Sequence, residues 1–194
     1  MNEVFSQTNY VIKQQGLSIA SKYRLYDAEG KTPLLFIEQK TKWLPPSTTT
    51  YAYADEKKTR EVLLLKDSPV EDVDWDVIDA ESGQKIGGLG MTADSVSEIF
   101  KDAWLITDAN DLAVGKVYEK SMGRSMLRGL MDNALTQQLH VDVGDTPVAT
   151  FRQKSSLVGY ELIVDFSMDV AHLLDRRLGI AAAIFVALHH GNEE

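Results

Sequence analysis

The sequence predicts a mainly β (α+β) fold, a closed antiparallel barrel around a central apolar C-terminal helix, with one amphipathic helix outside. Two observations support this prediction. Short turns built on aspartate recur between apolar runs, as in a chain of β-hairpins. Near the C-terminus, residues 178–188 are apolar on every side of a helix, so the helix needs protein around its whole circumference. The 194 residues are expected to form one domain, 1–194.

Four turns of similar composition divide the chain into hairpins. In each, an apolar or alternating run meets an aspartate, small or polar residues follow, and an apolar run resumes. The aspartate accepts a backbone hydrogen bond, and Gly or Asn supplies the positive φ that a tight turn needs. The turns lie within 25–30, 77–83, 106–111 and, in a looser form, 141–145. They predict at least eight strands.

Two further segments predict additional strands: 60–66, which has an apolar run of Val and Leu, and 160–166, which is rich in β-branched and aromatic residues. Such a meander closes either as a sandwich or as a barrel. The apolar C-terminal run favours the barrel. Its 11 residues span about 17 Å as a helix, whereas a bilayer crossing needs about 20 residues. Three consecutive alanines and Gly179 keep this helix thin, so we expect it to be buried over about 176–190.

A second helix is expected over 121–137, where Met, Leu and Ala recur at helical spacing along one arc. Gly123 and Gly129 weaken its helical propensity. We expect this amphipathic helix to lie on the sheet or over a mouth of the barrel. The oligomeric state is left open.

Six segments, taken in order, carry a resemblance to a known family: 26–30 (YDAEG), 75–79 (WDVID), 83–87 (GQKIG), 104–108 (WLITD), 115–119 (GKVYE) and 174–183 (LDRRLGIAAA). Together they resemble the LURP-one-related proteins, which share the tubby C-terminal-like fold with the phospholipid scramblases. The resemblance implies a barrel of about twelve strands around a central helix. It also implies a phosphoinositide or other lipid headgroup as ligand. The acidic calcium segment of scramblase-type members is not matched in spacing by Asp165, Asp169 and Asp175.

The composition limits the partners. The formal net charge is −9, which disfavours nucleic acid as a partner, because its binding rests on phosphate neutralisation. The same charge disfavours loose adsorption to anionic lipid unless a local basic pocket overrides it. The absence of cysteine excludes disulfides, a cysteine nucleophile and thiolate metal sites. The first residues do not resemble a secretory signal, so a cytoplasmic location, peripheral to a membrane, is expected.

Arg176 and Arg177 at the entrance of the buried helix are the first candidate ligand-binding residues. One interpretation is an anion or headgroup site at the mouth of the barrel. The other, which we favour, is that Asp175 caps the helix and the arginines bind strand-end carboxylates or carbonyls.

Lys120, Arg124 and Arg128 form the second candidate group, in which the two arginines share a helix face. They predict either an anion site or an ordinary solvated face, and the solvated face is the simpler interpretation.

The sequence supplies no catalytic or metal motif. Asp72, Asp74 and Asp76 match the first three ligands of a calcium loop, but Val77 and Gly83 stand where Gly and Glu are required. A charged strand edge, with the three aspartates on one face, is the better interpretation. The four histidines form no ligand pattern, and neither a nucleophile elbow nor a phosphate loop is present. We expect no cofactor, metal or catalytic residue.

The sequence therefore predicts a non-enzymatic barrel protein that binds a ligand or partner, with a lipid headgroup or a protein as the partner. Two alternatives remain open: a hydrolytic enzyme with a dispersed Asp/Glu/His site, and a structural oligomerisation module. A basic pocket would favour the first function. Convergent carboxylates of raised pKa would favour the hydrolase, and a large exposed apolar patch the oligomer.

Overall fold

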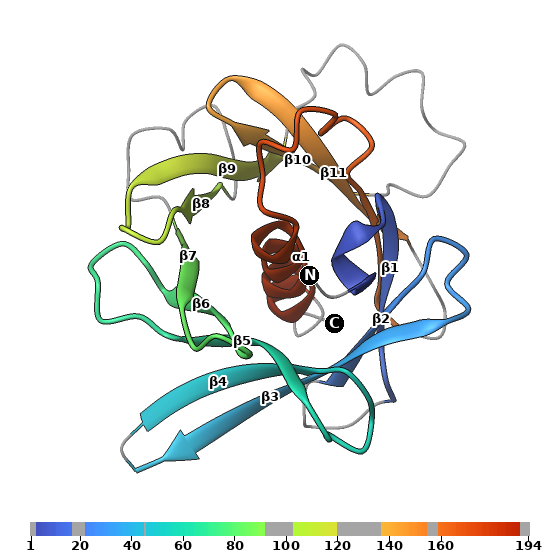
Figure 1. The fold of residues 1–194 in the computed structure, drawn as a ribbon, viewed down its shortest axis with the longest axis vertical. Coiled ribbons are helices and arrows are strands. Elements are labelled where there is room, and N and C mark those ends of the chain that lie inside the picture. Colours follow the sequence, from blue (N-terminus) through green and yellow to red (C-terminus); the bar gives the residue numbers. More distant parts are fainter. Residues whose placement is uncertain are drawn as a thin grey trace.

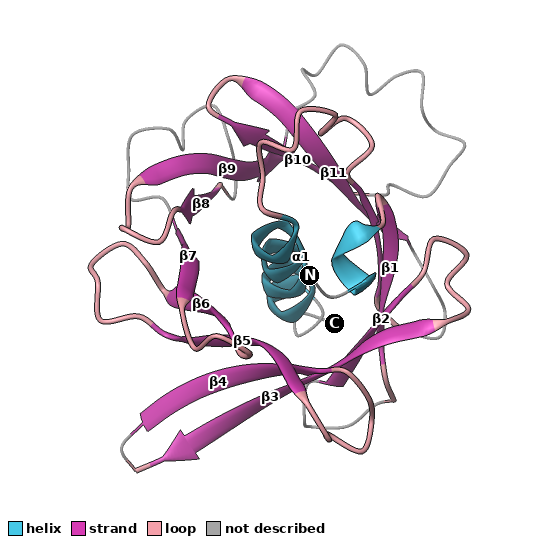
Figure 2. Ribbon diagram, viewed as in Figure 1, coloured by secondary structure: helices cyan, strands magenta, loops and turns pink. Residues whose placement is uncertain are grey.

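The computed structural model describes residues 3–16, 22–44, 46–91, 103–119, 137–154 and 159–190. Within these residues, twelve antiparallel strands form a closed barrel, and the helix α1 (Arg176–His190) lies in its interior (Figures 1 and 2). The predicted fold class is confirmed. The strands are β1 (Asn9–Gln14), β2 (Lys22–Tyr26), β3 (Pro33–Trp43), β4 (Pro46–Tyr53), β5 (Glu61–Asp67), β6 (Trp75–Asp79), β7 (Lys85–Met91), β8 (Trp104–Thr107), β9 (Ala113–Glu119), β10 (Gln138–Val143), β11 (Thr146–Lys154) and β12 (Glu161–Asp165).

Each strand pairs with its neighbours along the chain, and the ring closes where β1 pairs with β12. The four predicted turns join β2 to β3, β6 to β7, β8 to β9 and β10 to β11. In the first three, the side chains of Asp27, Asp79 and Asp108 accept hydrogen bonds from backbone amides two to five residues further on. Gly30 and Gly83 have positive φ angles of 66° and 69° in their turns. The hydrogen bonds and glycines of these turns therefore direct consecutive strands to pair as antiparallel hairpins.

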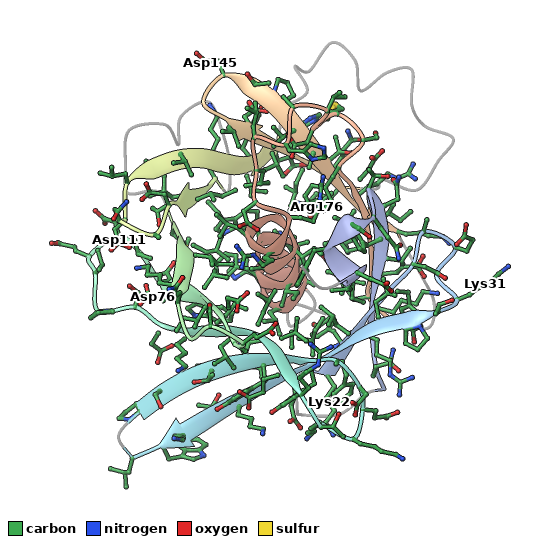
Figure 3. The ribbon with its side chains drawn as sticks, viewed as in Figure 1. Lys22, Lys31, Asp76, Asp111, Asp145 and Arg176 are labelled. Carbon is green, nitrogen blue, oxygen red and sulfur yellow. The ribbon has the colours of Figure 1, made fainter. Side chains whose placement is uncertain are left out.

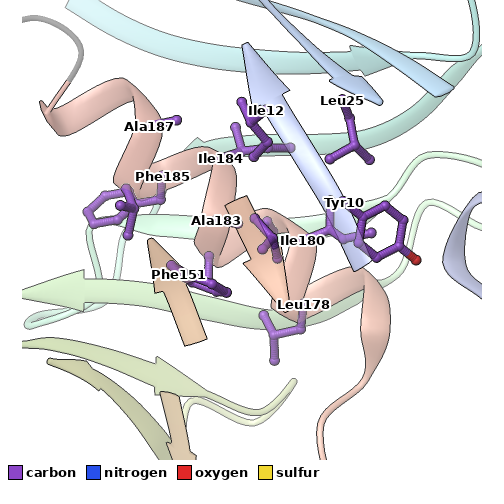
Figure 4. Packing of buried hydrophobic residues seen from close by; sticks show 14 of the residues in the cluster. Tyr10, Ile12, Leu25, Phe151, Leu178, Ile180, Ala183, Ile184, Phe185 and Ala187 are labelled. Atoms are coloured by element: carbon purple, nitrogen blue, oxygen red, sulfur yellow. The ribbon is translucent and has the colours of Figure 1, made fainter. Parts of the chain in front are cut away.

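The interior of the barrel is filled by α1. All residues from 178 to 188 are buried, so the helix has no solvent face. Figure 4 shows Ile180 and Ile184 of α1 among inward-facing residues of the strands, such as Ile12 and Phe151. Because alternate residues of a strand face opposite sides, each strand gives one row to this core and one row to the outside. The confirmed central helix thus leaves the outer wall and the two ends of the barrel for binding.

The two ends of the barrel are named by α1. Arg177, at the start of the helix, binds Asp79 at the end of β6, and we call this side the N-end. His189 and His190, at the finish of the helix, lie with their ring centroids 5.8 and 5.5 Å from that of Trp104 at the start of β8. We call this side the C-end.

A short 3-10 helix, η1 (Glu3–Ser6), lies beside α1 within the ring of strands (Figure 1). Its Val4 and Phe5 side chains are buried. The Tyr10 hydroxyl on β1 lies 2.8 Å from the carbonyl oxygens of both Val4 and Gln7, so its one hydrogen is shared between these two acceptors. The N-terminal turn is therefore part of the core.

The acidic stretch differs from its prediction. Asp72 and Asp74 lie in the loop before β6, with Asp72 at a φ of 64°, and only Asp76 lies in the strand. The three aspartates therefore do not share a strand face, and that expectation was wrong. The physical reason is that the Asp74 carboxylate stabilises the loop: it accepts a hydrogen bond from the Met91 amide at 2.9 Å.

Two further expectations concern helices. The amphipathic helix predicted over 121–137 lies outside the described residues, except for Gln137 at its end. Of the helices in the described ranges, none is long and apolar enough to cross a membrane.

Candidate functional site

Arg177 is held by two carboxylates at the N-end. Its Nη1 donates to Asp79 Oδ2 at 2.7 Å, and its Nε and Nη2 donate to the two oxygens of Asp175 at 3.0 and 2.6 Å. The Arg177 backbone amide also donates to Asp175 Oδ1 at 2.9 Å, which confirms the predicted cap. The hydrogen bonds from Arg177 to Asp175, and next to Asp79, raise the pKa of the guanidinium although burial lowers it. Arg177 is a fixed cation that binds a strand-end carboxylate.

Arg176 is enclosed. Its side chain is 10% exposed, and its Nη2 lies 3.9 Å from Oδ2 of the fully buried Asp169. Its Cζ stacks 4.1 Å from the ring centroid of Phe166. Figure 3 shows Arg176 inside the ring of strands, whereas Lys31 projects outside it. The guanidinium group of Arg177 is therefore engaged within the chain, whereas Nη1 of the enclosed Arg176 has no hydrogen-bond partner among the described residues.

A pocket of about 290 Å³ opens beside Arg177 at the N-end. Its charged lining consists of three carboxylates and two guanidinium groups, one of which is the paired Arg177; the lining residues are Phe5, Arg60, Glu61, Val62, Asp79, Glu81 and Arg177. An anion would meet an acidic wall here. The pKa of Asp79 is lowered by the backbone hydrogen bond from Ser82, against the effect of burial and with help from Arg177. The acidic lining therefore disfavours an anion, and the lowered pKa of Asp79 makes this carboxyl a poor general acid.

The second predicted group, Lys120, Arg124 and Arg128, lies outside the described residues. The flanking residues Glu119 and Gln137 are joined by a hydrogen bond of 3.2 Å at the C-end.

The outer wall over β3 and β4 carries a group of charged and aromatic side chains that the sequence analysis missed. By register, its strand residues face outward and alternate with residues of the core, with Tyr53 opposite Phe36 and Tyr51 opposite Glu38. The turn after β4 adds a lysine. We call this group the basic–aromatic patch; its members are Phe36, Glu38, Lys40, Tyr51, Tyr53 and Lys58.

The tyrosines form the floor of the basic–aromatic patch. The rings of Tyr51 and Tyr53 are stacked, with centroids 5.7 Å apart and planes within 6°. Lys40 Nζ lies 4.7 Å from the Tyr51 centroid, and Lys58 Nζ lies 5.9 Å from the centroids of Tyr53 and Phe36. Ammonium groups at these distances are attracted to the negative face of an aromatic ring. The rings therefore fix both lysines over the wall.

Both ammonium groups converge on one carboxylate oxygen. Oε2 of Glu38 lies 2.6 Å from Lys58 Nζ and 3.5 Å from Lys40 Nζ. Burial raises the pKa of Glu38, but the hydrogen bonds and charges of Lys58 and Lys40 lower it overall, so the carboxyl group is ionised. The hydroxyl of Tyr53 raises the pKa of Lys40. Two fixed cations on one anion leave a net positive charge on the outer face.

The turn that presents Lys58 is tightly built. Lys58 has a φ of 60°, and its amide donates to the Asp55 carbonyl at 3.0 Å. The Thr59 hydroxyl donates to the Asp55 carboxylate, and this hydrogen bond lowers the pKa of Asp55. The position of the Lys58 ammonium therefore follows from the turn and not only from its own long side chain.

The surroundings of the basic–aromatic patch are positive in an otherwise acidic chain. Residues 22–66 contain nine of the 20 Lys and Arg residues but six of the 29 Asp and Glu residues. A hollow of about 170 Å³ borders the patch at Phe36 and is lined also by Arg24 and Glu56, which pair at 2.7 Å. The two-residue alternation of 36, 38, 40 and of 51, 53 was the signal in the sequence for this face.

Comparisons of the chain with protein-family models, with curated proteins and with solved structures found no match. Membership of the LURP-one-related family therefore stays a prediction from the sequence segments.

Proposed function

We propose that this protein is a non-enzymatic barrel that binds an anionic lipid headgroup of the phosphoinositide class through the basic–aromatic patch. The observation that carries the proposal is the convergence of Lys40 and Lys58 on one oxygen above two stacked tyrosines. A lysine ammonium has three donors, so each cation keeps hydrogen-bonding capacity for a phosphate oxygen. The resemblance to tubby-type proteins favours the same class of ligand.

The arrangement suits recognition rather than catalysis. The only carboxylate of the basic–aromatic patch, Glu38, is held ionised between two ammonium groups and is buried, so it is poorly placed to exchange a proton with a substrate. A phosphate that approaches the patch takes over part of the hydrogen bonding that Glu38 supplies to Lys40 and Lys58. The proposal includes a cytoplasmic location, because the cytoplasmic leaflet carries the anionic lipids.

The test is the binding of the full chain to vesicles. We expect binding to phosphatidylcholine vesicles that contain a phosphoinositide, weakened by salt, and little binding to pure phosphatidylcholine. Lys40→Ala together with Lys58→Ala removes two cations worth about 1 kcal/mol each at an anionic surface, so affinity falls roughly 30-fold.

The matched control is Lys116→Ala together with Lys154→Ala. It removes the same charge, and Lys116 likewise lies over a tyrosine, 5.2 Å from the Tyr118 centroid, but on β9. We expect this control to bind like the wild type. Equal losses in both double variants, or equal binding of the wild type to neutral vesicles, would contradict the proposal.

A further inference from the structure

The strands β3 and β4 continue past the barrel wall as a two-stranded ribbon. β2 pairs with β3 only as far as Glu38, and β5 pairs with β4 only from Thr49 onward. Among the described residues, which leave out 17–21 and 45, residues 39–43 and 46–48 therefore pair only with each other. At about 3.3 Å per residue, β3 extends roughly 17 Å beyond Glu38. Figure 1 shows this hairpin standing out from the ring of strands.

Two large apolar side chains lie at the end of this ribbon. Trp43 is 88% exposed and Leu44 is 92% exposed, more than the other large apolar residues in the described ranges. The other two tryptophans of the chain pack against the interior: Trp104 is buried, and the Trp75 ring lies 5.4 Å from that of Phe185. A single exposed leucine is ordinary, but an indole beside a leucine at the tip of a hairpin serves no packing role.

A cationic segment separates this apolar tip from the barrel. Lys42 pairs with Ser47 and Lys40 pairs with Thr49, so both lysines lie on the outward face that continues into the basic–aromatic patch. Residues 39–48 contain these two lysines and no carboxylate. The base of the ribbon is tied by the Thr48 amide, which donates to Asp67 Oδ2 at 2.7 Å. The ribbon thus has an apolar tip, Trp43 and Leu44, and a positively charged stem that carries Lys40 and Lys42. A hydrogen bond fixes its base to the barrel.

We propose that the β3–β4 ribbon inserts Trp43 and Leu44 into the interfacial region of an anionic bilayer, with Lys40 and Lys42 at the level of the headgroups. This inference rests on the proposed function and deepens it, because it states how the basic–aromatic patch is turned toward the membrane. Lys40 belongs to both the stem and the patch, so insertion of the tip brings the patch to the headgroups.

Three observations favour a bilayer over a protein as the occupant. The described residues of the tip present two exposed large apolar side chains, Trp43 and Leu44, whereas a stable protein interface buries about 800 Å² on each partner. An indole prefers the boundary between apolar and wet surroundings, which the interfacial region of a membrane supplies. The lysines behind the tip complement anionic lipid, and apolar insertion adds to that attraction.

Tryptophan fluorescence with brominated lipids tests the inference on the full chain. Vesicles contain phosphatidylcholine with brominated acyl chains and a phosphoinositide. We expect a blue shift and quenching of the emission of the wild type on binding, because Trp43 enters the bilayer. Trp43→Phe is expected to bind with nearly the same affinity and to lose this quenching, which assigns the signal to Trp43. Quenching that persists in Trp43→Phe, or vesicle binding without quenching in the wild type, would overturn the inference.

Leu44→Asp separates insertion from headgroup binding. We expect it to melt like the wild type, to bind vesicles about tenfold more weakly, and to bind a soluble inositol phosphate unchanged. If wild type binds neither probe, the proposed function fails and the insertion fails with it. If wild type and Leu44→Asp bind both probes equally, the insertion alone is wrong. A third outcome would assign the tip to a second copy of the chain instead. In that case sedimentation shows a dimer that Leu44→Asp disrupts, and the fluorescence emission of Trp43 is blue-shifted before lipid is added.

Discussion

Asp79 shows how one turn residue connects distant parts of the chain. Its Oδ1 accepts hydrogen bonds from the Ser82 amide and hydroxyl at 2.8 and 3.0 Å, as the turn pattern predicted. Its Oδ2 accepts from Arg177, 98 residues later. The first role is predictable from local sequence, because the turn lies within a few residues. The second is not, because it depends on how far α1 enters the barrel.

Asp79 also gives the stability a pH dependence. Its folded pKa is lowered by the Ser82 amide first, with burial opposing and Arg177 assisting, so the unfolded chain takes up the proton first. Its stabilising contribution is fully present above the unfolded pKa of about 4 and is lost as the pH falls through the folded pKa. We expect Asp79→Asn to lower the free energy of unfolding at pH 7 by about 1–3 kcal/mol. Below about pH 4 the free energy of unfolding should then fall less steeply with decreasing pH than it does in the wild type. Urea unfolding at a series of pH values measures both effects.

Asp145→Asn is the control for this experiment, because Asp145 projects from the β10–β11 turn into solvent (Figure 3). It should change neither the stability nor its slope with pH. Parallel pH curves for Asp79→Asn and the wild type would contradict the role given to Asp79.

At the scale of elements, α1 was the most predictable part of the structure. Its run of apolar residues has no polar face, and residues 176–190 are helical as predicted. Gly179 explains how closely it packs: a Cβ at this position would lie 2.6 Å from Cε1 of Phe166, closer than non-bonded carbon atoms approach. The β3–β4 ribbon was not predictable, because its extent depends on where the pairing of β2 and β5 stops.

Removal of α1 should abolish the fold. A chain that ends at Arg177 loses six large buried side chains, at about 2 kcal/mol each, against a net stability of about 5–15 kcal/mol. Ala182→Asp should be nearly as damaging, because it buries an unpaired charge. Circular dichroism and thermal melts measure the outcome. A cooperative melt of the truncated chain near the full-length value would show that the strands close without the helix.

At the scale of the whole molecule, α1 fills the interior of the barrel, so the proposed binding is expected on the outside. The meander and its closure around α1 followed from local turns and one apolar run, which are properties of contiguous sequence. The basic–aromatic patch did not, because it joins residues of two paired strands and of the turn after them. The predicted basic groups were sought as neighbours in sequence, and Arg176 and Arg177 proved to be ion-paired within the chain. Cross-strand register was the missing information.

Amide chemical shift mapping of the 15N-labelled full chain with phosphoinositide nanodiscs tests the central claim, binding on the outer wall over β3 and β4, most directly. We predict that the largest perturbations fall within residues 38–44, 47–53 and 58, and that the amides of β9 to β11 and the middle of α1 stay unchanged. Nanodiscs of phosphatidylcholine alone should leave the spectrum nearly unchanged. Perturbations centred on Arg60, Arg176 and Arg177 at the N-end, with none on β3 and β4, would contradict the account.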